Sequence, residues 1–116
     1  MKANELMIGN WISTSFLDEE RLMIISEIGE FSVVCENKET DAECGFKVIY
    51  PIPLTEEWLV KFGFENKTKS FVLNNISIKQ QTKGYFFYLN MMIQYVHQLQ
   101  NLYFALTGEE LKNQLR

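Results

Sequence analysis

The 116-residue sequence has few of the residues that catalytic and metal sites need. It contains one histidine, His97, and two cysteines, Cys35 and Cys44. A zinc site made from these three residues would be one ligand short, so we expect no metal site. The six glycines are isolated from one another, which excludes phosphate-binding loops and dinucleotide fingerprints. We therefore expect a protein that is not an enzyme and that has no cofactor.

Long apolar runs are also absent. Polar residues interrupt the first ten positions, so they do not resemble a signal peptide, and no later stretch has the length of a membrane span. We expect a cytoplasmic protein with free thiols and no membrane partner. If residues 37 to 43 form a hairpin loop, Cys35 and Cys44 face each other across two strands, and an oxidising setting would be needed to join them.

Basic residues are outnumbered by acidic ones. There are 11 Lys and Arg against 15 Asp and Glu, which gives a formal net charge of −4. A chain of this charge has no overall positive field to attract nucleic acid. The charge is nevertheless uneven, because residues 1 to 60 contain twelve acidic and four basic side chains, whereas residues 61 to 116 contain three acidic and seven basic ones.

Apolar residues are plentiful, at 47% of the chain, and 14% of the residues are aromatic. This is enough apolar material for a chain of this length to bury a core, so we predict a single domain over residues 1–116. The predicted class is α+β, with a mainly antiparallel small sheet or partial barrel on which one short and one longer helix pack.

Period-two alternation predicts strands in the first half of the chain. Phe31, Val33 and Cys35 would share one face of a strand, and residues 37 to 43 would form the loop that follows it. The predicted strands are residues 6–12, 22–28, 31–36 and 46–50.

Helix signals begin after Pro51 and Pro53. Thr55 is a suitable N-cap and Gly63 a suitable end, which predicts a short helix near residues 55 to 62. Trp58 in this helix is predicted to be a core residue. Three further strands are expected at residues 71–73, 76–79 and 85–89, with a tight turn at residues 74 and 75.

A longer helix is predicted near residues 94 to 107, with Gly108 just beyond its end. One face is apolar and contains Tyr95, Val96, Leu99, Leu102, Tyr103 and Leu106. The opposite face contains His97, Gln100, Asn101 and Phe104. These uncharged hydrogen-bonding groups around an aromatic ring suit a partner's backbone, so we predict a protein-binding surface there. The alternative is a helix buried on two sides, whose amides cap neighbouring strands.

A second predicted site lies among the basic residues of the later part of the chain. Lysines next to exposed aromatic rings suit a nucleotide or another small anionic ligand, because the cations meet phosphate while the rings stack on a base. The alternative is a solvated strand edge, on which lysine discourages aggregation. The residues of this alternative ligand-binding site are Lys69, Lys79, Lys83, Tyr85, Phe87 and Tyr88.

Three stretches carry a resemblance to a known family. They are ANELMIGNW at residues 3–11, PIPLTEEWL at 51–59 with Phe62-Gly63-Phe64 behind it, and YVHQLQNLYFALTGEEL at 95–111. Together they resemble a family of small uncharacterised proteins encoded by gut Bacteroidetes and by their bacteriophages and mobile elements. Met7 departs from the family pattern, which has a basic residue there. The resemblance implies a cytoplasmic accessory protein of a bacterium or phage, and it brings no known activity or binding residue.

These observations favour a non-enzymatic protein-interaction module, with a host protein or a second copy of the chain as its partner and a homo-oligomer as one expected form. A small-ligand or nucleotide-binding protein that sequesters its ligand is the alternative function. Salt-sensitive binding would distinguish the ligand-binding protein from the protein-interaction module, because ions screen contacts between lysine and phosphate.

Overall fold

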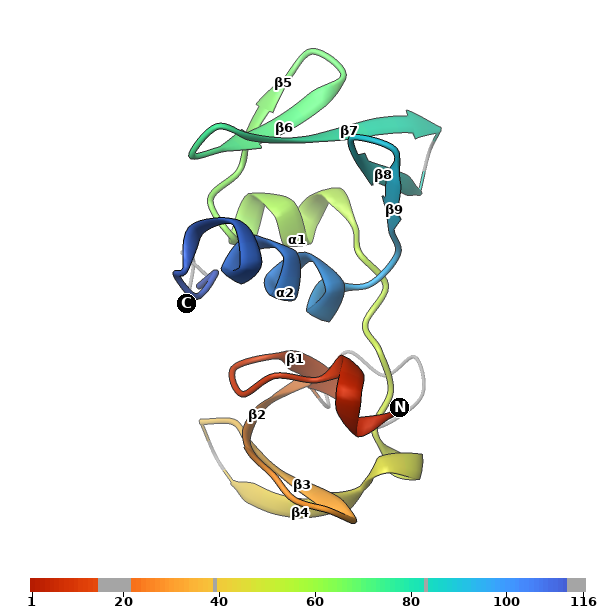
Figure 1. Ribbon diagram of the computed structural model, residues 1–116, viewed down its shortest axis with the longest axis vertical. Coiled ribbons are helices and arrows are strands. Elements are labelled where there is room, and N and C mark those ends of the chain that lie inside the picture. The colour runs from red at the N-terminus through yellow and green to blue at the C-terminus, as the bar shows by residue number, and fades with distance from the viewer. Residues whose placement is uncertain (15–21, 39, 83, 113–116) are drawn as a thin grey trace. The chain divides into compact units, whose positions relative to one another are not determined.

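A computed structural model describes residues 1–14, 22–38, 40–82 and 84–112 (Figure 1). The chain divides into two compact units. Unit 1 comprises Met1–Ile52 and Val96–Glu110, and unit 2 comprises Pro53–Tyr95 and Leu111–Arg116. The predicted α+β class is confirmed, with two antiparallel sheets, one short helix and one longer helix, and the described residues form no closed barrel. The single domain expected over residues 1–116 stays a prediction.

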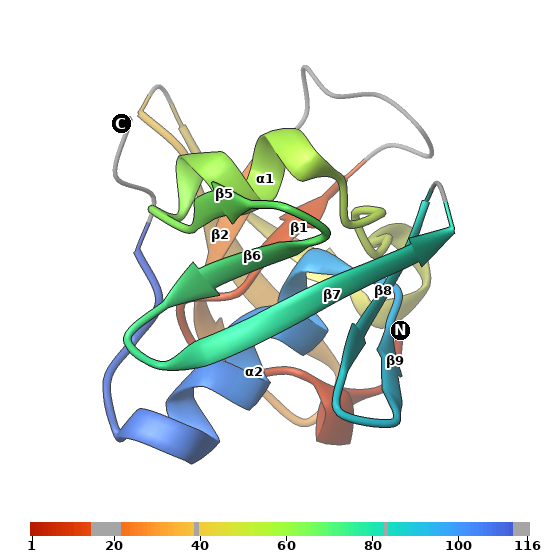
Figure 2. The same ribbon diagram turned by 90° about the horizontal axis from the view of Figure 1, so that it is seen from above.

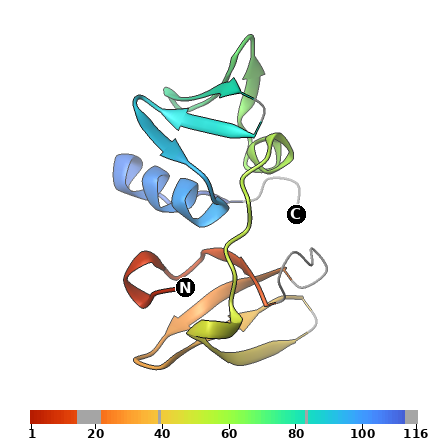
Figure 3. The same cartoon turned by 90° about the vertical axis from the view of Figure 1, so that its right-hand side faces the viewer.

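Unit 1 contains a four-stranded antiparallel sheet in the order β1-β2-β3-β4, seen from another side in Figure 3. Helix α2 (Val96–Thr107) packs against β1. The sheet is made of β1 (Trp11–Ser13), β2 (Leu22–Ile28), β3 (Ser32–Glu36) and β4 (Asp41–Gly45), and the 3-10 turns η1 (Ala3–Glu5) and η3 (Phe46–Val48) lie outside it.

The buried cluster on the sheet of unit 1 consists of aliphatic and sulfur-containing side chains, and Tyr103 of α2 is also buried in this unit. Alternate residues of β2 and β3 are buried, as the period of a strand requires. A register shift between Ile25 and Glu27 interrupts the pairing of these two strands. The buried cluster consists of Leu6, Ile12, Met23, Ile25, Val33, Cys35 and Ile49. Each side chain of this size contributes about 1.5 to 3 kcal/mol when it is fully buried.

Unit 2 contains a five-stranded antiparallel sheet in the order β5-β6-β7-β8-β9 (Figure 2). Its interior is rich in aromatic rings, and Phe71 lies 6.3 Å from Phe86 in an edge-on arrangement. The strands are β5 (Glu65–Lys67), β6 (Ser70–Leu73), β7 (Ile76–Thr82), β8 (Tyr85–Tyr88) and β9 (Met91–Ile93). Asn74 and Asn75 both have positive φ, which confirms the predicted tight turn between β6 and β7.

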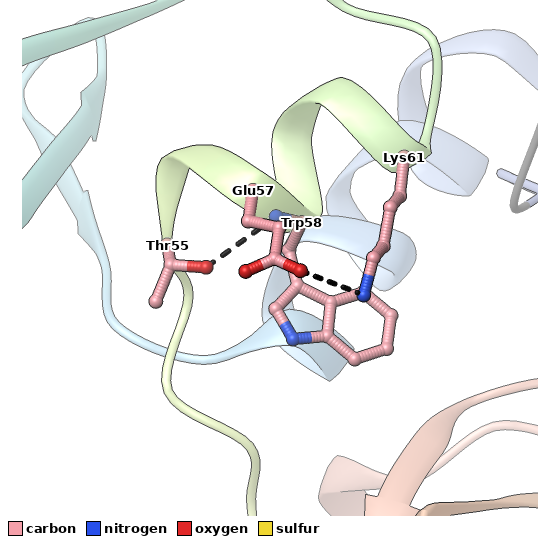
Figure 4. A network of polar contacts seen from close by, with 4 residues as sticks. All are labelled: Thr55, Glu57, Trp58 and Lys61. Carbon is pink, nitrogen blue, oxygen red and sulfur yellow. Dashed lines mark hydrogen bonds and ion pairs between the residues drawn. The ribbon is translucent and has the colours of Figure 1, made fainter. Parts of the chain in front are cut away.

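Helix α1 (Glu56–Lys61) belongs to unit 2 and has the predicted ends. The Thr55 side chain accepts a hydrogen bond from the Trp58 N–H (Figure 4). At the other end Gly63 has a φ of 95°, and the N–H groups of Gly63 and Phe64 donate to Val60 and Leu59. This pair of hydrogen bonds is typical of a helix that ends at a glycine in the left-handed conformation.

The Trp58 side chain of α1 is 7% exposed, which confirms it as a core residue. The Lys61 ammonium lies 3.2 Å from the Glu57 carboxylate and 5.2 Å from the centre of the Trp58 ring (Figure 4). The basic end of this short helix thus covers its buried indole.

The strand that follows β3 was placed wrongly. The Asn37 side chain accepts from the Thr40 N–H at 2.9 Å and closes the turn early. Strand β4 therefore falls on residues predicted as loop, and η3 replaces the predicted strand at 46–50. Apolar alternation did not reveal β4, because it is an exposed polar edge strand. Phe31, predicted to face inward with Val33, lies in the preceding turn and is 81% exposed.

Other strands also differ from the prediction. The strand predicted at 6–12 is reduced to β1, because residues 7 to 10 form a turn in which Gly9 has a φ of 95°. The short strands β5 and β9 were missed. The longer helix is confirmed, beginning at Val96 and ending before Gly108, which has a φ of 74°.

Candidate functional site

The polar face of α2 is only partly accessible. His97 and Gln100 are buried, at 3% and 5% exposure, and Asn101 is half-buried. Phe104 is 43% exposed. The structure therefore places two of the four residues predicted for this binding surface inside unit 1, an arrangement that matches the alternative of a helix buried on two sides.

Gln100 uses both ends of its amide within unit 1. Its Oε1 accepts from the Trp11 N–H at 2.8 Å, and its Nε2 donates to the Gly9 carbonyl at 2.9 Å. A side chain of α2 thereby supplies the hydrogen bonds that the chain needs where it enters β1. Because the amide is engaged on both sides, it holds the segment rather than offering groups to a partner.

Asn10 and Asn101 continue this network. Asn10 Nδ2 donates to Asn101 Oδ1 at 2.8 Å, and Asn10 Oδ1 accepts from the Met7 N–H at 2.7 Å. Asn101 Nδ2 donates to the Glu5 carbonyl at 3.0 Å. We call Asn10, Gln100 and Asn101 the amide network. It fixes the turn of residues 7 to 10 against α2.

A pocket of about 360 Å³ lies against this fixed turn. Its walls are mostly apolar, with the exposed side chains of Ile8, at 64%, and Phe104 on it. We call it the Phe104 pocket. It is lined by Met7, Ile8, Gly9, Asn10, Ile28, Gln100, Asn101, Phe104 and Glu110.

Glu110 is the charged residue of the Phe104 pocket. Its carboxylate lies so close to Gly9 that a methyl group on Gly9 would collide with it. Gly9 is favoured by its φ of 95°, whereas the Glu110 carboxylate is the end of an exposed, flexible side chain that can move aside. An apolar surface with one carboxylate suits a ligand that is apolar and carries a positive charge.

His97 lies about one helical turn before Gln100 in α2 but does not line the pocket. Burial lowers the pKa of its imidazole below the ordinary value of 6.5, and the Glu5 carboxylate acts in the opposite direction. His97 is thus held neutral in the interior of unit 1 at pH 7.

The alternative ligand-binding residues lie in unit 2, and the structure brings only some of them together. The register places Lys67, Ser70, Lys79, Phe87 and Met92 in one row across all five strands. This row lies on the face opposite to the buried side chains, since neighbours along a strand point to opposite faces. Lys79 therefore lies directly beside the half-buried ring of Phe87.

The remaining residues of that prediction are dispersed. Tyr85 is 52% exposed and shares the face of Phe87, whereas Tyr88 lies on the other face with Phe86. Lys69 is in the turn between β5 and β6, with a φ of 70°. Lys83 lies outside the described residues.

Cys35 and Cys44 are both free thiols in unit 1. Cys35 pairs with Ala42 and Cys44 with Val33, so the two cysteines are diagonal neighbours rather than directly opposite. Burial, with a smaller effect of Cys44, raises the pKa of the Cys35 thiol to about 11. Within the described part of the chain, no three His, Cys, Asp or Glu side chains are grouped to hold a metal ion.

Comparisons with known proteins add no relative. No family model matches the chain, and no curated protein and no solved structure matches it. No helix among the described residues is long and apolar enough to cross a membrane.

Sequence reasoning missed six residues of the Phe104 pocket, namely Met7, Ile8, Gly9, Asn10, Ile28 and Glu110. They come from separate parts of the chain, which are brought together by the contacts of residues 5 to 11 with α2 and with β2. The isolated Gly9 before a buried Asn10 was the available signal, because glycine in a turn often marks a close approach of other groups.

Proposed function

We propose that this protein is a non-enzymatic protein-interaction module whose Phe104 pocket binds an apolar side chain of a partner. The observation that carries the proposal is the exposure of Ile8 and Phe104 on a pocket with a rigid base. Exposed apolar groups of this kind are typical of interaction sites. The partner would be a host protein or a second copy of the chain.

Two features of unit 1 support this function. The amide network holds the turn that carries Ile8, so little conformational entropy is lost on binding. His97 is the single histidine of the chain, so a histidine general base would have to be this residue. It is only 3% exposed. The cytoplasmic bacterial or phage setting implied by the family resemblance remains part of the proposal.

Selection of peptides from a random display library would test this function. We expect peptides that bind the protein and lose at least tenfold in affinity, about 1.4 kcal/mol, when Phe104→Ser is introduced. Leu106→Ser is the matched control, because Leu106 is on the same helix, is 46% exposed and does not line the pocket.

Sedimentation of both variants over a range of concentrations would test a second copy of the chain as the partner. The proposal fails if no selected peptide depends on Phe104 and if Phe104→Ser leaves self-association as it is in the Leu106→Ser control. Far-UV circular dichroism of each variant shows that the fold is retained.

A second candidate function is the binding of an anionic aromatic ligand by unit 2. The cross-strand neighbours Lys79 and Phe87 favour it, since a cation next to a ring can meet phosphate and base together. Fluorescence anisotropy with a labelled single-stranded oligonucleotide would detect binding that weakens with salt. Lys79→Gln should reduce that binding, whereas Lys47→Gln in unit 1 should not.

A further inference from the structure

We infer that the Phe104 pocket selects a basic segment, in which a Lys or Arg follows or precedes an aliphatic residue and its cation pairs with Glu110. This inference rests on the proposed function and names the class of partner. It depends on three observations, which are the position of the Glu110 carboxylate, the ion pairs of the described residues, and the charge of unit 1.

Glu110 brings its carboxylate to the Phe104 pocket, next to the turn of residues 7 to 10. Its carboxylate lies over Gly9, and Gly9 is fixed in turn by the bond from its N–H to the Ile25 carbonyl and by the bond from Gln100 to its own carbonyl. A negative charge thus lies beside a mainly apolar surface whose turn is held by these two bonds.

Glu110 has no cationic partner among the residues that the structure describes. The ion pairs found there are Lys61 with Glu57 and Lys67 with Glu65, and both lie in unit 2. Glu110 is exposed, so a ligand can reach its carboxylate from solvent. A cation from a partner would pair with this carboxylate without breaking an ion pair inside the protein.

The charge of unit 1 favours the same kind of partner. Its two stretches contain twelve acidic and four basic residues, so it attracts basic segments and repels acidic ones. The pocket walls then explain why the segment should be apolar as well as basic. Lys and Arg place their aliphatic stems on apolar surface while the charged end extends to a polar group, and Ile8 and Phe104 offer such surface beside Glu110.

The peptide selection described above tests this inference with one further pair of variants. We expect Lys or Arg next to an aliphatic residue in the peptides that depend on Phe104. Glu110→Gln keeps the size of the side chain. It should lower the affinity for these peptides at least about threefold and reduce the salt dependence of binding. Glu109→Gln is the matched control, because Glu109 is an exposed neighbour that does not line the pocket.

The reverse change and the peptide partner complete the test. Glu110→Lys should shift the selected peptides toward acidic ones. Replacing the basic residue of a selected peptide by Gln should weaken binding to the natural protein more than binding to Glu110→Gln.

The outcomes separate the two proposals. If no peptide depends on Phe104, the proposed function fails. If peptides depend on Phe104 but show no excess of basic residues, or if Glu110→Gln binds them as Glu109→Gln does, the pocket binds proteins and only the selection of basic segments is overturned.

Discussion

The two units of this protein are stabilised by different kinds of contact. In unit 2 the stabilising features lie close together in sequence, such as the Thr55 cap, the Gly63 end and the turn at Asn74 and Asn75. In unit 1 the helix is tied to the start of the chain by side chains, and the Asn10 to Asn101 bond joins residues 91 positions apart. The attachment of α2 to the start of the chain in unit 1 therefore depends on a few long-range hydrogen bonds. A local cap or turn cannot replace these bonds when they are lost.

Core and charge differ in the same way. Unit 1 buries an aliphatic cluster on its sheet and one tyrosine, Tyr103, on its helix, whereas Trp58, Phe62, Phe64, Phe71 and Phe86 are all buried residues of unit 2. Unit 2 contains three acidic and seven basic residues, the reverse of unit 1. One chain thus carries two surfaces of opposite charge, so a given partner is attracted by one unit and repelled by the other.

Each unit has its own fluorescent reporter. Trp11 is in β1 of unit 1 and Trp58 is in α1 of unit 2, and these are the two tryptophans of the chain. Trp58→Phe and Trp11→Phe therefore give proteins whose unfolding in urea is followed in unit 1 alone or in unit 2 alone.

The largest effect is expected from Gln100→Leu in the amide network. This change leaves the partly buried Trp11 N–H and Gly9 carbonyl without the partners that Gln100 gives them. The free energy of unfolding should fall by about 2 to 4 kcal/mol, and hydrogen exchange at the Trp11 amide should become faster. The urea midpoint reported by Trp11 should move further than that reported by Trp58. Equal shifts at both reporters would mean that the units unfold together, and the contrast between them would not extend to stability.

A pH-dependent effect is expected in unit 1, which contains the one histidine. Burial lowers the pKa of His97 in the folded state, so the unfolded state binds more protons just below pH 6.5. Stability should therefore be complete above about pH 6.5 and fall as the pH decreases, by at most about 1.4 kcal/mol per pH unit. Urea unfolding at pH 8.0 and pH 5.5 measures this.

His97→Gln provides the comparison for that pH effect. The variant is expected to be less stable at pH 8.0, because a buried side chain is changed, but to lose less stability between the two pH values. The same pH dependence in both proteins would assign the effect to other groups.

The contrast between the units also explains what the sequence could predict. The ends of α1 and the turn before β7 were predicted correctly, because Thr55, Gly63 and Asn75 act on their immediate neighbours. The polar edge strand β4 was not, because its partner is the only reason that Asp41 to Gly45 are extended.

The candidate site also combines features that are local in sequence with features that depend on the fold. The sequence identified Gln100, Asn101 and Phe104 as residues on one helix face. It contains no local sign that the side chain of Asn10 would donate a hydrogen bond to that of Asn101. Nor does it show that Glu110 would lie over Gly9, since that approach depends on the path of the chain after α2. Helical periodicity was therefore enough to place Gln100, Asn101 and Phe104 on one face. Only the fold shows which of them belong to the amide network and which side chain is open to a ligand.

The smallest effect is expected from a change to a local feature of unit 2, the glycine that ends α1. Gly63 has a φ of 95°, in the region that residues with a Cβ disfavour, so Gly63→Ala should reduce the free energy of unfolding by about 1 kcal/mol. Gly45→Ala is the matched control in unit 1, because Gly45 has a φ of −65° and open space where the methyl group would lie. It should change stability by less than about 0.5 kcal/mol. The Trp58 reporter should detect the loss in Gly63→Ala, because the glycine closes the helix that carries this indole. A loss as large as that of Gln100→Leu would show that unit 2 also depends on one critical position, and the distinction between local and long-range closure would then be removed.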